Sequence, residues 1–265
     1  MKSARLSGTW LGKIVVAMVL LFVLLPILWL AYSAFLPPDA IFQSSGVPTG
    51  FTFENFAKLP FDALIRPLIL SLIVSSSVAF LQLCVSLPAA YAIRGGTRLL
   101  PLYLLLLSIP AELMLIPLYG LLKDLQLLNN PLALVLPFVA NPFIVFLLYS
   151  GMAKLPWTFI EAARLDGAHN IQILLRVVAP LLRPEMTAAA VLGFAAHWNL
   201  VLYPKVVLDN PQWWTVQVAL TEMLRKDPNA WGKLGAAAMV TSLPILILYI
   251  FFESRVTKTL EGGLK

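Results

Sequence analysis

The chain has 265 residues, of which 60% are hydrophobic and 12% are charged, and its mean hydropathy is +0.86. Because a soluble globular domain has about 25% charged residues, this composition excludes an ordinary water-soluble fold and predicts a membrane protein. At about 20 apolar residues per crossing, the chain has room for roughly five to seven spans and for no sizeable soluble domain. The net charge of +6 is interpreted as a topology signal and not as a sign of nucleic-acid binding, because excess Lys and Arg marks the cytoplasmic side of membrane proteins.

The apolar segments predict an all-α, polytopic bundle of six transmembrane helices. The first segment exceeds the apolar core of about 7–15 residues found in cleavable signal peptides, so we expect a retained anchor. We expect residues 1–265 to form a single transmembrane domain with one large cytoplasmic loop, residues 151–184. The spans are expected at residues 14–36, 67–93, 99–122, 131–149, 185–208 and 234–252.

The distribution of basic residues favours this six-span arrangement with both termini in the cytoplasm. Twelve Lys and Arg lie on the predicted inner side and seven on the outer side, as the positive-inside rule requires. The inner residues are Lys2, Arg5, Lys13, Arg94, Arg98, Lys154, Arg164, Arg176, Arg183, Arg255, Lys258 and Lys265. The outer residues are Lys58, Arg66, Lys123, Lys205, Arg225, Lys226 and Lys233.

Catalytic signatures are missing from the sequence. It contains no Gly-x-x-x-x-Gly-Lys-Ser/Thr phosphate loop, no Gly-x-Ser-x-Gly elbow and no His-Glu-x-x-His pair, and its two histidines are His169 and His197. We therefore predict that the chain is not an enzyme, hydrolyses no ATP and binds no metal. If it moves a solute uphill, the energy must come from a partner protein or from an ion gradient.

A short helix that lies parallel to the membrane is predicted within the cytoplasmic loop. Pro156 suits the first turn of this helix, and Gly167 can adopt the left-handed conformation that ends it. Ala162 and Ala163 leave a low surface that a partner protein can approach closely, and Glu161 offers a charge to an Arg or Lys of that partner. An acid at Asp166 opposes the helix dipole, so we expect it to have another partner.

The same loop resembles the EAA motif of the permeases of ABC importers. The family pattern is Glu-Ala-Ala, three residues, Gly, nine residues and then Ile-x-Leu-Pro. Here Val177 is conservative for the Ile, whereas Ala179 replaces the Leu. The positions that match in register are Glu161, Ala162, Ala163, Gly167 and Pro180.

Three further segments resemble the carbohydrate branch of this family, in particular the second membrane component of the maltose permease. They are Leu125–Pro137 (LQLLNNPLALVLP), Trp198-Asn199 with Tyr203-Pro204, and the tail Gly262-Gly263-Leu264-Lys265. Tyr203 replaces a usual Trp, and a final Gly of the family's tail is missing. The resemblance implies that Gly262, Gly263 and Lys265 reach the ATPase dimer interface.

The resemblance also implies a fold, a location and a set of partners. The fold is that of a type I ABC importer permease, in the cytoplasmic membrane of a bacterium or archaeon. The partners are a second, different permease subunit, two copies of an ABC ATPase, an extracytoplasmic solute-binding protein, a sugar and membrane lipid, with no nucleic acid. This chain itself binds no cofactor, because ATP and Mg²⁺ belong to the ATPase. The residues that couple to the ATPase are Glu161, Ala162, Ala163, Arg164, Asp166 and Gly167.

Several polar and aromatic residues within the spans are candidates for the solute pathway. Glu112 is ionisable and lies near the middle of the third span, where such a group is costly and indicates function. Two roles for Glu112 remain open: its carboxylate accepts hydrogen bonds from sugar hydroxyls, or it makes an interhelical hydrogen bond near Pro110. The full candidate set is Glu112, Tyr119, Asn141, His197, Trp198 and Asn199.

The leading interpretation is therefore a permease subunit of an ATP-driven importer for a disaccharide, an oligosaccharide or a related polyol such as glycerol phosphate. The first alternative is an ABC permease for a non-carbohydrate solute. A second alternative, an ion-coupled secondary transporter, predicts inverted repeats and several intramembrane ionisable groups. A third, an intramembrane enzyme, predicts a catalytic pair within the spans, and the sequence has neither feature.

Overall fold

The structure, a computed structural model, describes residues 10–37, 40 and 50–263. Every regular element in these ranges is helical, which confirms the predicted all-α class. The helices belong to two compact units. Unit 1 comprises Met1–Phe61 and Leu220–Leu243, and unit 2 comprises Asp62–Ala219 and Pro244–Lys265.

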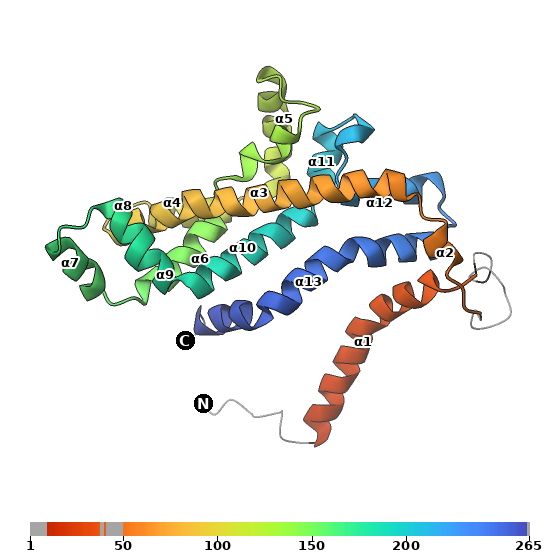
Figure 1. The fold of residues 1–265 in the computed structure, drawn as a ribbon, viewed down its shortest axis with the longest axis horizontal. Coiled ribbons are helices and arrows are strands. Elements are labelled where there is room, and N and C mark those ends of the chain that lie inside the picture. The colour runs from red at the N-terminus through yellow and green to blue at the C-terminus, as the bar shows by residue number, and fades with distance from the viewer. Residues whose placement is uncertain (1–9, 38–39, 41–49, 264–265) are drawn as a thin grey trace. The chain divides into compact units, whose positions relative to one another are not determined.

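Helices of very different lengths follow one another along the chain (Figure 1). Their bounds are α1 Trp10–Ala34, α2 Glu54–Ala57, α3 Phe61–Arg94, α4 Leu100–Leu107, η3 Ala111–Met114, α5 Leu115–Asp124, η4 Pro131–Leu134, η5 Leu136–Phe138, α6 Pro142–Ala153, α7 Thr158–Leu165, α8 Asn170–Ile173, η6 Leu174–Val178, α9 Ala179–Leu181, α10 Arg183–Trp198, α11 Leu202–Val207, η7 Pro211–Trp213, α12 Val216–Lys226 and α13 Trp231–Gly263.

Long apolar helices supply the candidate membrane spans. Three are long and apolar enough to cross a membrane alone: Gly12–Ala34, Phe61–Arg94 and Trp231–Glu253. Three pairs of shorter helices also qualify when each pair is taken together: Leu100–Leu107 with Ala111–Asp124, Pro131–Phe138 with Pro142–Ala153, and Asn170–Leu181 with Arg183–Trp198. The bends within these pairs are 92°, 41° and 84°. The described residues thus carry three to six candidate spans, a range that includes the predicted six.

Each of the three bends has a proline at or next to it. Pro110 directly precedes η3, Pro142 is the first residue of α6, and Pro184 is the second residue of α10. A proline has no backbone N–H, so it fits the first turn of a helix but interrupts a helix interior. These prolines therefore start a new helix after each bend.

Unit 1 is organised around the carboxyl-terminal end of α1. The buried side chain of Asn55 donates hydrogen bonds to the carbonyl oxygens of Ala34 at 2.9 Å and of Leu36 at 2.7 Å. These carbonyls lie where the helical ladder ends and have lost their intrahelical donors. Asn55 thus satisfies groups that would be costly to bury alone.

Two of the hydrophobic clusters of unit 2 support the segments that carry the candidate sites. The first joins the carboxyl-terminal half of α3 to α6, α7, α8, η6 and α10, and its largest buried members are Ile144, Leu148, Met152, Ile160, Ile173 and Leu182. The second joins the middle of α3 to α5, η4 and α11, and its buried members include Val78, Leu122, Leu134, Val207 and Leu208. The first cluster supports the segment with the predicted partner-binding motif.

Candidate functional site

Helix α7 carries the predicted partner-binding motif and lies at one end of unit 2, beyond α8 (Figure 1). Ile160 anchors it, because this side chain is only 2% exposed and belongs to the first cluster, together with residues of α6 and η6. Burial of an isoleucine side chain contributes about 1.5–3 kcal/mol. One face of α7 is therefore fixed to the body of the unit.

The opposite face of α7 is open. Phe159 is 51% exposed and Leu165 is 89% exposed, and Glu161 and Ala162 are exposed beside them. The adjacent Ala163 instead packs partly against the first cluster, because successive residues of a helix point about 100° apart. The open face thus combines the small side chain of an alanine, two larger apolar side chains and one carboxylate.

Gly167 ends α7 as the sequence predicted. Its φ is +82°, in the left-handed region that favours glycine. The N–H of Gly167 donates to the carbonyl of Arg164, and the N–H of Ala168 donates to the carbonyl of Ala163, both at 3.0 Å. This pair of bonds is a Schellman motif, which satisfies the last carbonyls of a helix.

Two acids, one in the first turn of α7 and one directly after its last residue, have no ion-pair partner in the part of the chain that the structure describes. Glu161 lies in the first turn of α7, where the helix dipole favours a negative charge. Asp166 follows the last helical residue, and its side chain is exposed. Both carboxylates are therefore available to a partner protein.

Glu112 and Asn141 line one cavity of about 470 Å³ in unit 2. Glu112 lies in η3 at the 92° bend, and Asn141 caps the start of α6. The Asn141 Oδ1 accepts from the N–H groups of Phe143 at 2.9 Å and Ile144 at 3.4 Å. The Asn141 Nδ2 has no hydrogen-bond partner among the described residues and remains available as a donor. The other lining residues are mainly apolar, with Tyr203 among them.

The remaining pathway candidates lie outside the lining of this cavity. Tyr119 is 38% exposed on α5. Trp198 is 2% exposed and stacks on Phe194, with ring centroids 5.5 Å apart. The exposed Asn199 donates to the carbonyl of Ala195 at 2.8 Å. A pathway role for these residues and for the buried His197 stays a prediction.

Two of the sequence segments that carried the family resemblance contact each other. The hydroxyl of Tyr203 donates to the carbonyl of Ala133, and the Nε2 of His197 donates to the carbonyl of Leu134, both at 2.7 Å. The Nε2 of Gln82 donates to the carbonyl of Phe138 at 2.9 Å. These three side chains satisfy carbonyls of η4 and η5, where short 3₁₀ helices leave backbone groups without partners.

Asn129 adds a third contact between the two segments. Its Oδ1 accepts from the N–H groups of Asp209 at 2.6 Å and Asn210 at 3.0 Å, and its own N–H donates to the carbonyl of Val207 at 3.0 Å. Its φ is +58°, a left-handed conformation that asparagine tolerates better than most residues. Residues 125–137 and 197–210 therefore behave as one hydrogen-bonded assembly next to the Glu112 cavity.

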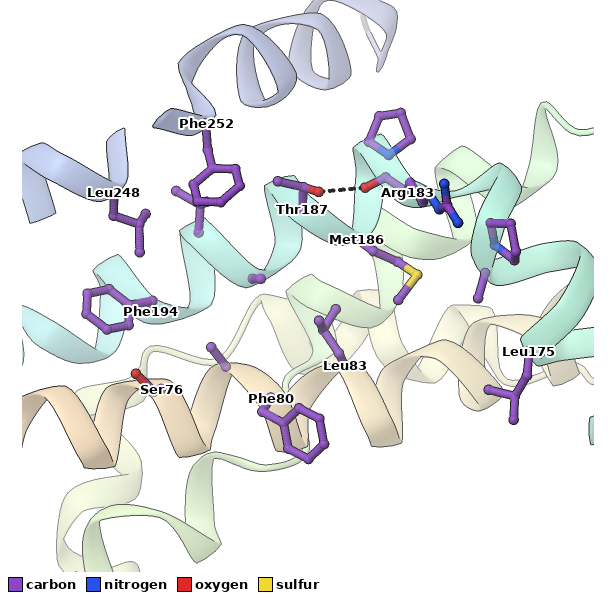
Figure 2. A pocket seen from close by; sticks show the side chains of 16 residues that line it. Ser76, Phe80, Leu83, Leu175, Arg183, Met186, Thr187, Phe194, Leu248 and Phe252 are labelled. Carbon is purple, nitrogen blue, oxygen red and sulfur yellow. Dashed lines mark hydrogen bonds between the residues drawn. The ribbon is translucent and has the colours of Figure 1, made fainter. Parts of the chain in front are cut away.

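A second, larger cavity of about 840 Å³ lies in unit 2 between α3, η6, α10 and α13. Figure 2 shows Leu83 of α3 opposite Met186 of α10, with Leu248 and Phe252 of α13 on the other side of α10. Its polar or charged lining side chains are Ser76, Arg183 and Thr187, and Thr187 donates to the carbonyl of Arg183 at 2.8 Å. This cavity offers few groups to a hydroxyl-rich solute, so Glu112 and Asn141 mark the better candidate site.

The comparison with protein families identifies the chain. Residues 82–258 match the sequence profile of the binding-protein-dependent transport system inner membrane components. The chain belongs to this family. The match contains α7, the Glu112 cavity and both segments of the hydrogen-bonded assembly.

Curated relatives match this permease over most of their length. The arabinooligosaccharides transport system permease protein AraQ of Halalkalibacterium halodurans is 30% identical over 97% of this chain and 96% of its own. The diacetylchitobiose uptake system permease protein NgcG of Streptomyces coelicolor is 32% identical over 91% of this chain and 83% of its own. The trehalose/maltose transport system permease protein MalG of Thermococcus litoralis is 28% identical over 96% and 94% of the two chains. The predicted membership in the ABC permeases is confirmed.

A solved structure confirms the predicted permease fold. One chain of a bacterial ABC transporter that imports the acidic polysaccharide alginate superposes with a TM-score of 0.81. The two chains are 21% identical, and the superposition covers 96% of this permease and 98% of the other chain.

Membership in this family assigns the chain to the inner membrane as a multi-pass, non-catalytic component of a transport system. It implies a solute-binding protein and an ATPase as partners. Among residues 10–37, 40 and 50–263, no three His, Cys, Asp or Glu side chains are grouped so that they could hold a metal ion. The family assignment decides against an ion-coupled secondary transporter and an intramembrane enzyme.

The predicted ATPase-contacting tail lies at the end of α13. This helix continues to Gly263, so Gly262 and Gly263 are its last residues. Lys265 lies outside the described residues. Contact of this tail with an ATPase stays a prediction.

Sequence reasoning did not single out Gln82 of this permease. A lone glutamine within an apolar span is a detectable signal, because a polar side chain in a membrane must find a hydrogen-bond partner. The partner could not be predicted, since Phe138 lies 56 residues further along the chain. Gly193 also contributes, because a Cβ there would lie 2.4 Å from the Gln82 Oε1. A side chain at position 193 would therefore displace the Gln82 amide from its place between α10 and α3.

Removal of the Tyr203 hydroxyl is expected to destabilise the permease. Tyr203→Phe keeps the ring, which is 7% exposed, but leaves the Ala133 carbonyl without its donor. An unsatisfied buried carbonyl costs about 1–3 kcal/mol, which lowers the thermal midpoint by about 2–10 °C. Thermal unfolding of the detergent-solubilised permease measures this shift. Tyr119→Phe is the matched control, and an equal shift in both variants would show that the Ala133 bond contributes nothing.

Proposed function

We propose that this chain is one of two different permease subunits of an ATP-driven carbohydrate importer, and that α7 transmits the movement of the ATPase to the membrane helices. The observation that carries this proposal is the arrangement of α7. Ile160 fixes one face of the helix to the core, while Phe159, Ala162 and Leu165 are exposed on the others. An exposed apolar surface on a segment anchored in this way is suited to a protein partner.

The ATPase-binding surface is assigned to Glu161, Ala162, Ala163, Arg164, Asp166 and Gly167. Ala162 lets the surface of the partner approach the helix backbone, and the two flanking apolar side chains fill neighbouring hollows of that surface. Glu161 pairs with a basic residue of the ATPase. Gly167 keeps the helix short, so that α7 fits a cleft and moves as one body.

The basic end of unit 2 supports a cytoplasmic location for α7. Figure 1 shows the end of α3 and the starts of α4 and α10 at the same end of the unit as α7 and α8. This end has six basic side chains and three acidic ones. The basic ones are Arg94, Arg98, Lys154, Arg164, Arg176 and Arg183, and the acidic ones are Glu161, Asp166 and Glu185. By the positive-inside rule, it faces the cytoplasm.

This orientation defines the proposed topology. The three long helices, the first two bent pairs and the segment that begins with α10 each form one span, which gives six spans in a single transmembrane domain with both termini in the cytoplasm, while Asn170–Leu181 belongs to the cytoplasmic loop with α7. The predicted ranges 14–36, 67–93, 99–122, 131–149, 185–208 and 234–252 describe these spans. The bent pairs are compatible with a membrane because non-helical backbone at membrane depth is tolerated where it is packed in protein or lines a cavity.

A carbohydrate solute is supported by the relatives and by the Glu112 cavity. The named relatives transport arabinooligosaccharides, diacetylchitobiose and trehalose or maltose. Glu112 offers carboxylate acceptors and Asn141 an amide donor in an otherwise mainly apolar cavity. A disaccharide, an oligosaccharide or a related polyol presents many hydroxyl groups, each of which donates and accepts hydrogen bonds. The second permease subunit supplies the other half of the pathway.

The complete importer would contain this chain, a different second permease, two ATPase subunits and an extracytoplasmic solute-binding protein. ATP and Mg²⁺ bind to the ATPase subunits, and this chain binds neither. The tail residues Gly262, Gly263 and Lys265 contact the ATPase dimer interface from the cytoplasmic side. The mechanical task of this chain is to convert closure of the ATPase dimer into rearrangement of its helices.

Two measurements on the assembled importer test this function. In a Cys84→Ser background, Leu165→Cys is expected to form a crosslink with the ATPase, whereas Lys123→Cys is not. ATP hydrolysis by the complex with its binding protein is then measured with arabinotriose, diacetylchitobiose, maltose, trehalose or glycerol phosphate. At least one sugar is expected to stimulate hydrolysis several-fold. An ATPase that crosslinks at Lys123 and not at Leu165 would refute the docking surface, and failure of every one of these solutes to stimulate hydrolysis would refute the solute class.

A further inference from the structure

Trp157 lies at the start of α7 and contacts two arginines from different parts of the chain. The guanidinium carbon of Arg94 lies 5.0 Å from the centroid of a Trp157 ring, and that of Arg164 lies 5.8 Å from it. Both distances are within the range of about 6 Å at which a cation is attracted to an aromatic face. Arg94 is the last residue of α3, whereas Arg164 lies in α7. One indole therefore joins the long helix to the proposed ATPase-binding helix.

The surroundings of Arg94 give this arginine a reason to contact the Trp157 ring. Its Nε is buried and has no hydrogen-bond partner among residues 10–37, 40 and 50–263. No carboxylate in these ranges forms an ion pair with either arginine. A buried N–H without an acceptor is costly, and the electron-rich face of an indole is a favourable neighbour for the guanidinium that carries it. The arginine also lies at the carboxyl-terminal end of α3, where the helix dipole favours a cation.

Trp157 is held in place from a third side. Its ring packs against the first cluster, whose buried members include Leu87 and Ala90 of α3 and Ile160 of α7. The ring is thus fixed by apolar contacts while its face is in contact with the two cations. Since α7 also packs on α8 and η6, the indole provides a separate connection from α7 to α3.

We propose that Trp157 is a positioning residue that makes α3 follow the movement of α7. The inference rests on the proposed ATPase docking of α7 and adds to it the route by which the displacement reaches the membrane. The Trp157 ring carries the displacement to α3 through its cation–π contact with Arg94, while its contact with Arg164 lies within the α7 segment. Arg94 itself need not touch the ATPase.

Substitutions at Trp157 separate the aromatic contact from simple packing. Trp157→Phe keeps an aromatic face, whereas Trp157→Leu keeps an apolar side chain, somewhat smaller than that of phenylalanine, without one. The assembled importer is reconstituted in nanodiscs, and MgATP hydrolysis is measured with and without the partner binding protein. Trp157→Leu is expected to reduce the stimulation by the binding protein about tenfold, since the cation–π contact that links α7 to α3 is lost. Trp157→Phe is expected to retain most of it, and both variants are expected to bind the ATPase subunit with unchanged affinity.

Changes at Arg94 complete the test. Arg94→Lys keeps the cation and is expected to resemble Trp157→Phe, whereas Arg94→Gln is expected to resemble Trp157→Leu. The double variant Trp157→Leu with Arg94→Gln is expected to be no worse than either single variant, because both remove the same contact. Equal stimulation in the Leu and Phe variants, additive losses in the double variant, or weakened ATPase binding in Trp157→Leu would each overturn the proposal. A parallel Glu161→Lys variant distinguishes the failures: full ATPase binding and uptake in that variant would refute the docking of α7 itself.

Discussion

Charge reversal in Glu161→Lys is expected to abolish ATP-driven uptake while leaving the permease in the membrane. Glu161 is exposed in the first turn of α7 and has no ion-pair partner among the described residues. If it faces a basic residue of the ATPase, a lysine there replaces an attraction by a like-charge repulsion that costs several kcal/mol. The affinity of the ATPase for the permease should then fall by more than about a hundredfold. Titration of the purified ATPase against the permease in nanodiscs, together with uptake into proteoliposomes, measures both effects.

Two further variants control this prediction. Glu161→Gln removes the charge but keeps the size of the side chain, so it should weaken ATPase binding less than the lysine does. Asp124→Lys makes the same charge reversal at the exposed end of α5, away from the basic end of unit 2, and should leave binding and uptake unchanged. If Glu161→Lys transports solute at the normal rate, or if Asp124→Lys is equally defective, α7 is not the site at which the ATPase binds.

Residues close together in the sequence were enough to predict much of α7. The Glu-Ala-Ala motif, the proline before it and Gly167 together indicated a short helix and its end, and α7 has both features. The sequence predicted Pro156 in the first turn, but α7 begins two residues later, at Thr158, with Trp157 in the N-cap position. These features depend on neighbours within a few residues, and such neighbours are visible in a sequence.

Contacts between segments that are distant in the chain could not be predicted from the sequence. The bond from Tyr203 to Ala133 spans 70 residues, and no local pattern indicates that a hydroxyl will meet that carbonyl. His197 was a candidate for the solute pathway because it is polar and lies in a span, yet its Nε2 is bonded to Leu134. Polarity in a span indicates only that a partner is required. Which partner satisfies it depends on how the bent helices pack.

The geometry of the three bends also could not be predicted from the sequence. Prolines within the predicted spans indicated interruptions, but the angle at each bend follows from tertiary packing. At the 92° bend, Pro110 has an extended backbone (φ −59°, ψ 132°), and Glu112 follows it in η3. The bend places Glu112 in the same cavity as Asn141, which lies at the 41° bend of the next pair. Two interruptions that were separate in the sequence thus form one candidate site.

Removal of the charge at this site is expected to slow solute-dependent transport without affecting assembly. Glu112→Gln keeps the shape of the side chain but replaces a charged acceptor by a neutral one. Hydrogen bonds to charged groups contribute about 1.5–3 kcal/mol. If the Glu112 carboxylate holds sugar hydroxyls during translocation, its loss should lower the transport rate about tenfold. Uptake of labelled sugar by proteoliposomes with saturating binding protein measures the rate, and co-purification with the ATPase measures assembly.

A second substitution tests whether the cavity itself acts on the solute. Asn141→Ser keeps an N-cap oxygen for α6 but removes the Nδ2 donor that points to no described protein partner. If both side chains hold the solute, Asn141→Ser should slow transport as Glu112→Gln does, and the combined variant should lose less than the product of the two effects. Asp124→Asn, a neutralised acid on the exposed end of α5, serves as the control. Unchanged solute dependence in Glu112→Gln would remove this carboxylate from the pathway, and the cavity would then be a packing consequence of the two bends.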